Sequence, residues 1–150
     1  MTSNAQFATL WGIGAVPLAP GTAASLVAAL VAWPVIHFAG GPALALLSVA
    51  VGLFGVKVSG DYASESGKED PPDCVIDEVA GQWLACAFAP PSALGFLAAF
   101  LLFRLFDMAK PWPVSAAERL DGGWGIVADD MVAGLIAGIV VMLFDAAGFL

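Results

Sequence analysis

Paired carboxylates stand at two places where the sequence is otherwise apolar. Asp77 and Glu78 lie within VIDEVAGQWLA (75–85), and Asp129 and Asp130 open the run DDMVAGLIAGIVVMLF (129–144). Oxygen ligands of this kind suit Mg²⁺, and burying several like charges without partners is costly. The pattern therefore predicts that a divalent cation neutralises these acids.

A third charged group ends the apolar run before Pro111. Arg104, Asp107 and Lys110 follow one another at three-residue spacing, so on a helix they form a stripe. A guanidinium presents a planar fork of donors and an ammonium presents a point charge, and both bind phosphate. We expect Arg104 and Lys110 to bind phosphate and Asp107 to serve the metal.

The segment APGTAAS (19–25) adds a second anion-binding feature. Its turn precedes a helix, whose unpaired N–H groups attract phosphate, and Thr22 or Ser25 is expected to cap that helix. Gly21 and Thr22 are therefore candidate phosphate contacts. Acids for Mg²⁺ beside cations for phosphate indicate phosphoryl chemistry, in which a metal polarises the phosphate and activates water.

The sequence lacks the residues that a serine-histidine-aspartate triad or a zinc site requires. His37 is the single histidine, so no Ser/His/Asp arrangement and no zinc cluster of histidines and cysteines is present. Cys74 and Cys86 both fall within the predicted helix 72–89, too far apart to bridge, and are expected to be free thiols.

The composition indicates a membrane protein. The 150 residues, enough for one domain, are 60% hydrophobic and only 12% charged, with a mean hydropathy of +0.89, whereas soluble domains are about 25% charged. No charged residue precedes Lys57, and that stretch is too long for a signal peptide alone. The net charge of −8 argues against a nucleic-acid partner.

Proline and glycine breaks predict an all-α bundle of about five helices. Lengths of about 18 to 24 residues correspond to roughly 27 to 36 Å, the thickness of a bilayer core. A buried soluble bundle is the alternative. The expected helices are 22–39, 43–66, 72–89, 92–110 and 129–147.

A hairpin arrangement of these helices brings the charged segments to one end of the bundle. The other end then holds Gly40, Gly41, Pro90, Pro91 and the C-terminus. The positive-inside rule places the charged end in the cytoplasm. The basic residues that carry this prediction are Lys57, Lys68, Arg104, Lys110 and Arg119.

Several further charged residues fall outside these groups. Asp61 and Glu65 lie one helical turn apart, but their function is left open. Two groups are interpreted as solvated loops, namely Glu69, Asp70 and Asp73, and Glu118, Arg119 and Asp121. Gly134 and Gly138 form a G-x-x-x-G pattern, which predicts close helix packing.

Four motifs in this order resemble the phosphatidylglycerophosphatase A family. They are PGTAAS (20–25), IDEVAGQW (76–83), FRLFDMAKPWPV (103–114) and GGWGIVADDMVAG (122–134). The resemblance implies an all-helical, Mg²⁺-dependent phosphatase in the bacterial cytoplasmic membrane, which removes the terminal phosphate of phosphatidylglycerophosphate to leave phosphatidylglycerol.

The resemblance also assigns the site residues. The motifs match a DE pair, an R..D..K set and a DD pair, whereas the segment 61–73 is less similar to the family. The matched residues are Asp77, Glu78, Arg104, Asp107, Lys110, Asp129 and Asp130.

A membrane divalent-cation carrier or channel subunit is the alternative, since acids within membrane helices can line an ion pathway. Arg104 and Lys110 distinguish the two, because positive charges oppose a cation path but serve a phosphate site. A lipid phosphotransferase is disfavoured because the sequence has no DG..AR pattern. The number of metal ions, the carboxylate that positions water or acts as a nucleophile, the acyl-chain preference and the oligomeric state are left open.

Overall fold

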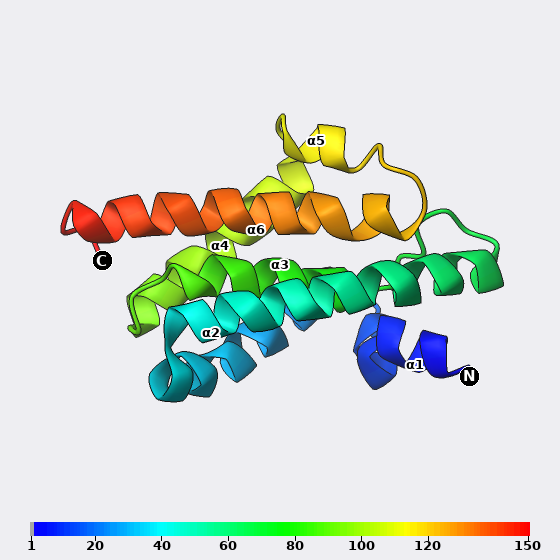
Figure 1. Ribbon diagram of the computed structural model, residues 1–150, viewed down its shortest axis with the longest axis horizontal. Helices are drawn as coiled ribbons and strands as arrows, with labels where there is room; N and C mark the ends of the chain where they lie inside the picture. The colour runs from blue at the N-terminus through cyan, green and yellow to red at the C-terminus, as the bar shows by residue number, and fades with distance from the viewer. Residues whose placement is uncertain (1) are drawn as a thin grey trace.

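Helices account for all the regular secondary structure in residues 2–150, which the computed structural model describes (Figure 1). This confirms the all-α prediction. The elements are α1 (Ser3–Ala8), a 3₁₀ helix η1 (Leu10–Ala15), α2 (Pro20–Ser66), α3 (Ile76–Ala87), α4 (Ala93–Ala109), α5 (Val114–Ala117) and α6 (Gly123–Ala146).

The long element α2 is a helical hairpin. Gly40 has φ 81° and ψ 169°, a conformation open essentially to glycine alone, and the chain reverses there (Figure 1). Both arms pack on α3, because Trp83 Nε1 donates to Ala28 O at 2.9 Å and Ser48 Oγ donates to Ala80 O at 2.7 Å. The two arms, 20–39 and 41–66, correspond to the first two predicted helices.

Small residues let α6 approach the centre of the bundle. A Cβ atom at Gly134 would overlap the Gly81 carbonyl oxygen, and one at Gly138 would lie 2.6 Å from the Phe88 ring. Gly81 in turn faces the fully buried Phe103 ring of α4. The predicted packing role of the G-x-x-x-G pattern is therefore confirmed, and α3 lies between α2, α4 and α6.

Two helix boundaries were predicted wrongly. The third helix begins at Ile76 rather than at 72, because the Val75 N–H donates to Ala8 O at 2.8 Å and holds the preceding segment against α1. The last helix begins at Gly123 rather than at 129, so Asp129 and Asp130 lie in its second turn instead of at its start. Helices α1, η1 and α5 had not been predicted.

Two helices, α2 and α6, are long and apolar enough to cross a membrane, with mean hydropathies of 1.9 and 2.2 in their most apolar stretches. Only 22% of that stretch of α2 is buried by protein. The prediction that every helix reaches bilayer thickness is wrong for α3, whose 12 residues span about 18 Å against the ~30 Å of a bilayer core.

The helix α4 also turns an apolar stripe outward. Its exposed side chains follow one another at intervals of three or four residues and form one face of the helix. They are Leu94, Leu97, Leu101, Leu105 and Met108.

The loops separate into two groups (Figure 1). The turn at Gly40, the connection 88–92 and the C-terminus lie at one end of the bundle, as predicted. The N-terminal helices, the connection 67–75 and the start of α6 lie toward the other end. The segments that carry the predicted site residues approach one another in this second half.

Candidate active site

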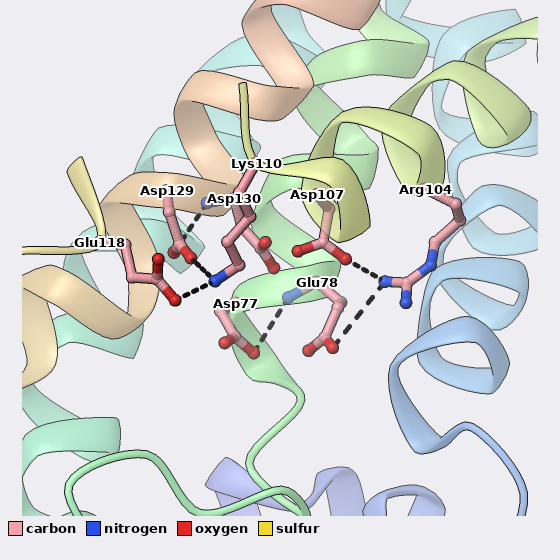
Figure 2. A network of polar contacts seen from close by, with 8 residues as sticks. All are labelled: Asp77, Glu78, Arg104, Asp107, Lys110, Glu118, Asp129 and Asp130. Atoms are coloured by element: carbon pink, nitrogen blue, oxygen red, sulfur yellow. Dashed lines mark hydrogen bonds and ion pairs between the residues drawn. The ribbon is translucent and has the colours of Figure 1, made fainter. Parts of the chain in front are cut away.

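Three carboxylates from two helices lie close together. Asp77 and Glu78 occupy the first turn of α3, and Asp130 lies in α6. One oxygen from each lies within 4.8 Å of the others (Figure 2). Asp77 is 8% exposed and Asp130 is 3% exposed, so water screens their mutual repulsion poorly.

Two of these residues, Asp77 and Glu78, leave hydrogen-bonding capacity unused. Glu78 Oε2 is buried without a hydrogen-bond partner among residues 2–150, and a buried acceptor without a partner is destabilising. Asp77 Oδ1 accepts one bond, from the Glu78 N–H at 3.1 Å. A set of buried oxygens with spare lone pairs fits a hard divalent cation such as Mg²⁺.

Arg104 and Asp107 border this set from α4. Arg104 Nη1 lies 2.6 Å from Asp107 Oδ2 and 3.9 Å from Glu78 Oε1, and Asp107 also extends toward Asp130 (Figure 2). Despite the short ion pair, neither Nε nor Nη1 of Arg104 makes a well-directed hydrogen bond. Nη1 is held in the ion pair with Asp107, and Nε is the buried donor left for an anionic ligand.

Lys110 lies on the opposite side of the carboxylates from Arg104 (Figure 2). Its Nζ donates to Asp129 Oδ2 at 2.7 Å and to Glu118 Oε1 at 2.6 Å. Burial lowers the pKa of Lys110, but these two hydrogen bonds outweigh it and hold the pKa above its ordinary value. The side chain is therefore a permanent positive charge at neutral pH.

The start of α2 packs directly against the charged residues, as predicted for the PGT segment. A Cβ atom at Gly21 would overlap Glu78 Oε1 and lie 3.2 Å from Arg104 Nη1. The capping prediction is wrong, because Ala19 is the N-cap residue and no side chain caps the helix. Ser25 Oγ instead donates to Gly21 O at 2.8 Å. The first N–H groups of α2, including that of Thr22, are therefore not occupied by a side-chain cap.

The acids of the second α2 arm lie apart from this site. Asp61 pairs with Lys57 at 2.7 Å, and Glu65 accepts hydrogen bonds from Thr2 and Asn4 of the N-terminal segment. These contacts tie the end of α2 to α1. They give Asp61 and Glu65 a structural explanation that the sequence left open.

The two cysteines are free thiols, as predicted, and both are buried. Cys74 precedes α3 rather than lying within a helix with Cys86, which corrects the predicted placement. Burial raises the pKa of the Cys74 thiol to about 11. His37 is exposed, and its Nδ1 lies 2.9 Å from Trp33 O on its own helix.

Glu118 is the residue that the sequence interpretation missed. It was assigned to a solvated loop, yet it is one of the two partners of Lys110. Pro111 and Pro113 follow Lys110, and this pair was the available signal that the chain turns back toward the lysine.

The described chain is all-helical and gathers buried carboxylates, an arginine and a lysine near the start of a helix, a set of groups suited to phosphoryl chemistry. The chain belongs to the phosphatidylglycerophosphatase A family, whose model matches residues 6–145. It is accordingly a phosphatase.

Named relatives agree with this assignment. "Phosphatidylglycerophosphatase A" of Escherichia coli (strain K12) is 36% identical over 136 residues, which cover 89% of this chain and 78% of that protein. The Haemophilus influenzae protein of the same name is 33% identical, with 87% and 82% covered. A Bacteroides thetaiotaomicron protein named "Putative phosphatidylinositol-3-phosphatase" is 37% identical, with 89% and 87% covered. No solved structure matches.

Proposed function

We propose that the chain hydrolyses the terminal phosphomonoester of phosphatidylglycerophosphate to give phosphatidylglycerol and inorganic phosphate. The observation that carries the proposal is the meeting of Asp77, Glu78 and Asp130 with Arg104 at the start of α2. Two of the relatives are named for activity on this substrate. Water supplies the oxygen that replaces the glycerol oxygen on phosphorus.

Asp77, Glu78 and Asp130 would hold Mg²⁺, which when bound neutralises phosphate charge and lowers the pKa of water. Asp107 and Asp129, also predicted as metal ligands, each have a cationic partner at 2.6 and 2.7 Å. We therefore assign Asp107 the orientation of Arg104, and Asp129 the orientation of Lys110. Both acids remain close enough to the site to contribute to its negative charge.

Arg104, Lys110 and the start of α2 would bind the phosphate. The Nε donor of Arg104 is buried without a partner, and a planar guanidinium matches two phosphate oxygens at once. The backbone N–H groups at Gly21 and Thr22 lie at the positive end of the helix dipole. Asp77, Glu78 and Asp130 would hold the metal beside a phosphate bound by these groups.

The alternative of a cation carrier is less well supported. Arg104 lies against Glu78 and Asp107, and Lys110 lies against Asp129. Two fixed positive charges beside the acids would repel a cation in transit. They serve a phosphomonoester, which carries negative charge.

Phosphate release from defined lipids tests the proposal. Purified protein in mixed micelles with Mg²⁺ is expected to release phosphate from phosphatidylglycerophosphate with a higher kcat/KM than from phosphatidylinositol 3-phosphate, the headgroup class named for the Bacteroides relative. Absence of release from phosphatidylglycerophosphate, or a preference for the phosphoinositide, would contradict the proposed substrate.

We also propose that the site faces the cytoplasm of a bacterial cell, from the bias of Lys and Arg toward the site half of the chain. Single cysteines at Ser66 and Ala116, both exposed and near the loops of that half, are expected to resist an impermeant maleimide on intact spheroplasts and to react after permeabilisation. Ala39, beside the turn at the far end, is the matched control and is expected to react from outside.

The parent protein provides the blank for this labelling. Cys74 and Cys86 are buried, and a thiol with a pKa of about 11 such as Cys74 has little thiolate at neutral pH. Labelling of Ser66→Cys and Ala116→Cys from opposite sides of the membrane would show that the two loops do not share a compartment, and the assigned orientation would fail.

A further inference from the structure

A cleft of about 700 Å³ opens on the Asp129 side of the site, and both partners of Lys110 line it. Glu118 lies in its outer wall, after the four-residue helix α5, and Asp129 lies in its inner wall on α6. Lys110 Nζ bridges the two carboxylates (Figure 2). The lysine that we assign to phosphate is therefore already occupied by two acids.

The two acids that bind Lys110 differ in exposure and in the number of their hydrogen bonds. The Asp129 side chain is 7% exposed, and its Oδ1 also accepts the Asp130 N–H at 2.9 Å. The Glu118 side chain is 47% exposed, and Lys110 is its sole side-chain partner among residues 2–150. An ion pair with one partner exposed to water contributes little stability. A buried carboxylate that accepts two hydrogen bonds is costly to separate from its partners.

Lys110 has an unusual backbone conformation and one unused donor. Lys110 ends α4 in the left-handed conformation, with φ 44° and ψ 51°, which is uncommon for a residue other than glycine. The ammonium has three donors, and two are used. A phosphate oxygen that accepts the third donor becomes the third anionic group around one ammonium, and the resulting repulsion is relieved when the exposed Glu118 carboxylate leaves.

We infer that Glu118 is a displaceable counter-ion, a positioning residue that occupies Lys110 between turnovers and yields its place to the phosphate of the substrate. Asp129 stays bound throughout and fixes the ammonium. The exchange replaces one oxyanion by another, so Lys110 is never left without an anionic partner. This inference rests on the proposed function, in which Lys110 binds phosphate, and adds a competing residue that the family motifs do not include.

Glu118→Gln is the direct test, with inorganic phosphate as the probe. Isothermal titration of the purified, Mg²⁺-loaded protein is expected to show phosphate binding tightened about two- to fivefold, the scale of a partly exposed ion pair. In the lipid assay, KM and the inhibition constant for phosphate are expected to fall together, without a rise in kcat. If Glu118 only held Lys110 in place, its replacement would weaken phosphate binding.

Two variants control this result. Glu118→Asp keeps the negative charge and is expected to restore phosphate affinity toward that of the parent. Asp121→Asn removes an acid that lines the same cleft but forms no ion pair with Lys110 within the described residues, and it is expected to leave phosphate affinity unchanged. Unchanged or weaker binding in Glu118→Gln, or an equal gain in Asp121→Asn, would overturn the inference.

The titration separates this inference from the proposed function. If the parent releases phosphate from phosphatidylglycerophosphate but Glu118→Gln binds phosphate like the parent, the counter-ion role fails and the proposed function stands. If the parent binds phosphate but does not turn over the lipid, the proposed function fails independently.

Discussion

Removal of divalent cations with EDTA is expected to lower the phosphatase activity at least about 100-fold, because metal stabilisation of phosphate charge contributes several kcal/mol to the barrier. The reason lies in the oxygens of Asp77, Glu78 and Asp130 within 4.8 Å of one another. Without a cation, these groups repel one another and Glu78 Oε2 stays without a partner. Phosphate release before and after chelation, and after Mg²⁺ is restored, measures the effect.

The same cation is expected to stabilise the fold, since a ligand that binds only the native state raises the free energy of unfolding. Mg²⁺ should raise the Tm of the parent, and Asp77→Asn should abolish that rise. Asp61→Asn is the matched control, because Asp61 pairs with Lys57 outside the site, and it should keep the Mg²⁺ response. Full turnover in EDTA, or an equal Mg²⁺ response in Asp77→Asn, would remove the metal from the proposed function.

Much of the site could be predicted from the sequence, because its residues are charged in segments where charge is costly. Asp77, Glu78 and Asp130 were singled out for that reason, and the structure brings them together. Arg104 was placed beside them by helix periodicity and hairpin topology, and it does border Glu78. These inferences needed only the sign of each charge and the direction of the chain.

The helix boundaries depended on contacts that a local pattern does not contain. The glycines of GGWG (122–125) resemble a turn, yet two of them lie in the first turn of α6. A Cβ atom at Gly123 would overlap the Val56 carbonyl oxygen, and one at Gly125 would overlap that of Leu120. These glycines therefore permit close packing rather than end a helix.

The sequence also did not show which carboxylates pair with a basic residue and which remain for the metal. Asp107 and Asp129 share the residue type and approximate position of the other three, so the sequence assigned all five to metal. In the structure, Asp107 pairs with Arg104 and Asp129 with Lys110. Only the rotation of α4 and α6 about their axes decides which acid meets a base, and that rotation is fixed by packing against α3.

Arg104→Lys is expected to lower kcat/KM about 100-fold, the effect of losing a well-placed donor to developing charge. Lysine keeps the positive charge beside Asp107 and Glu78, so the fold and the neutralisation of these acids should persist. It removes the planar fork, and with it the Nε donor that Arg104 leaves free. The loss should therefore appear in turnover, with little change in Tm.

Arg119→Lys provides the matched control for this substitution. Arg119 is the second arginine of the chain, is exposed, and lines the outer cleft rather than the carboxylates. The same chemical change there should leave kcat/KM within about twofold of the parent, as expected for a surface substitution. If Arg104→Lys also keeps parental kcat/KM, a point charge is sufficient at that position. The proposed two-point grip of the guanidinium on phosphate would then be wrong.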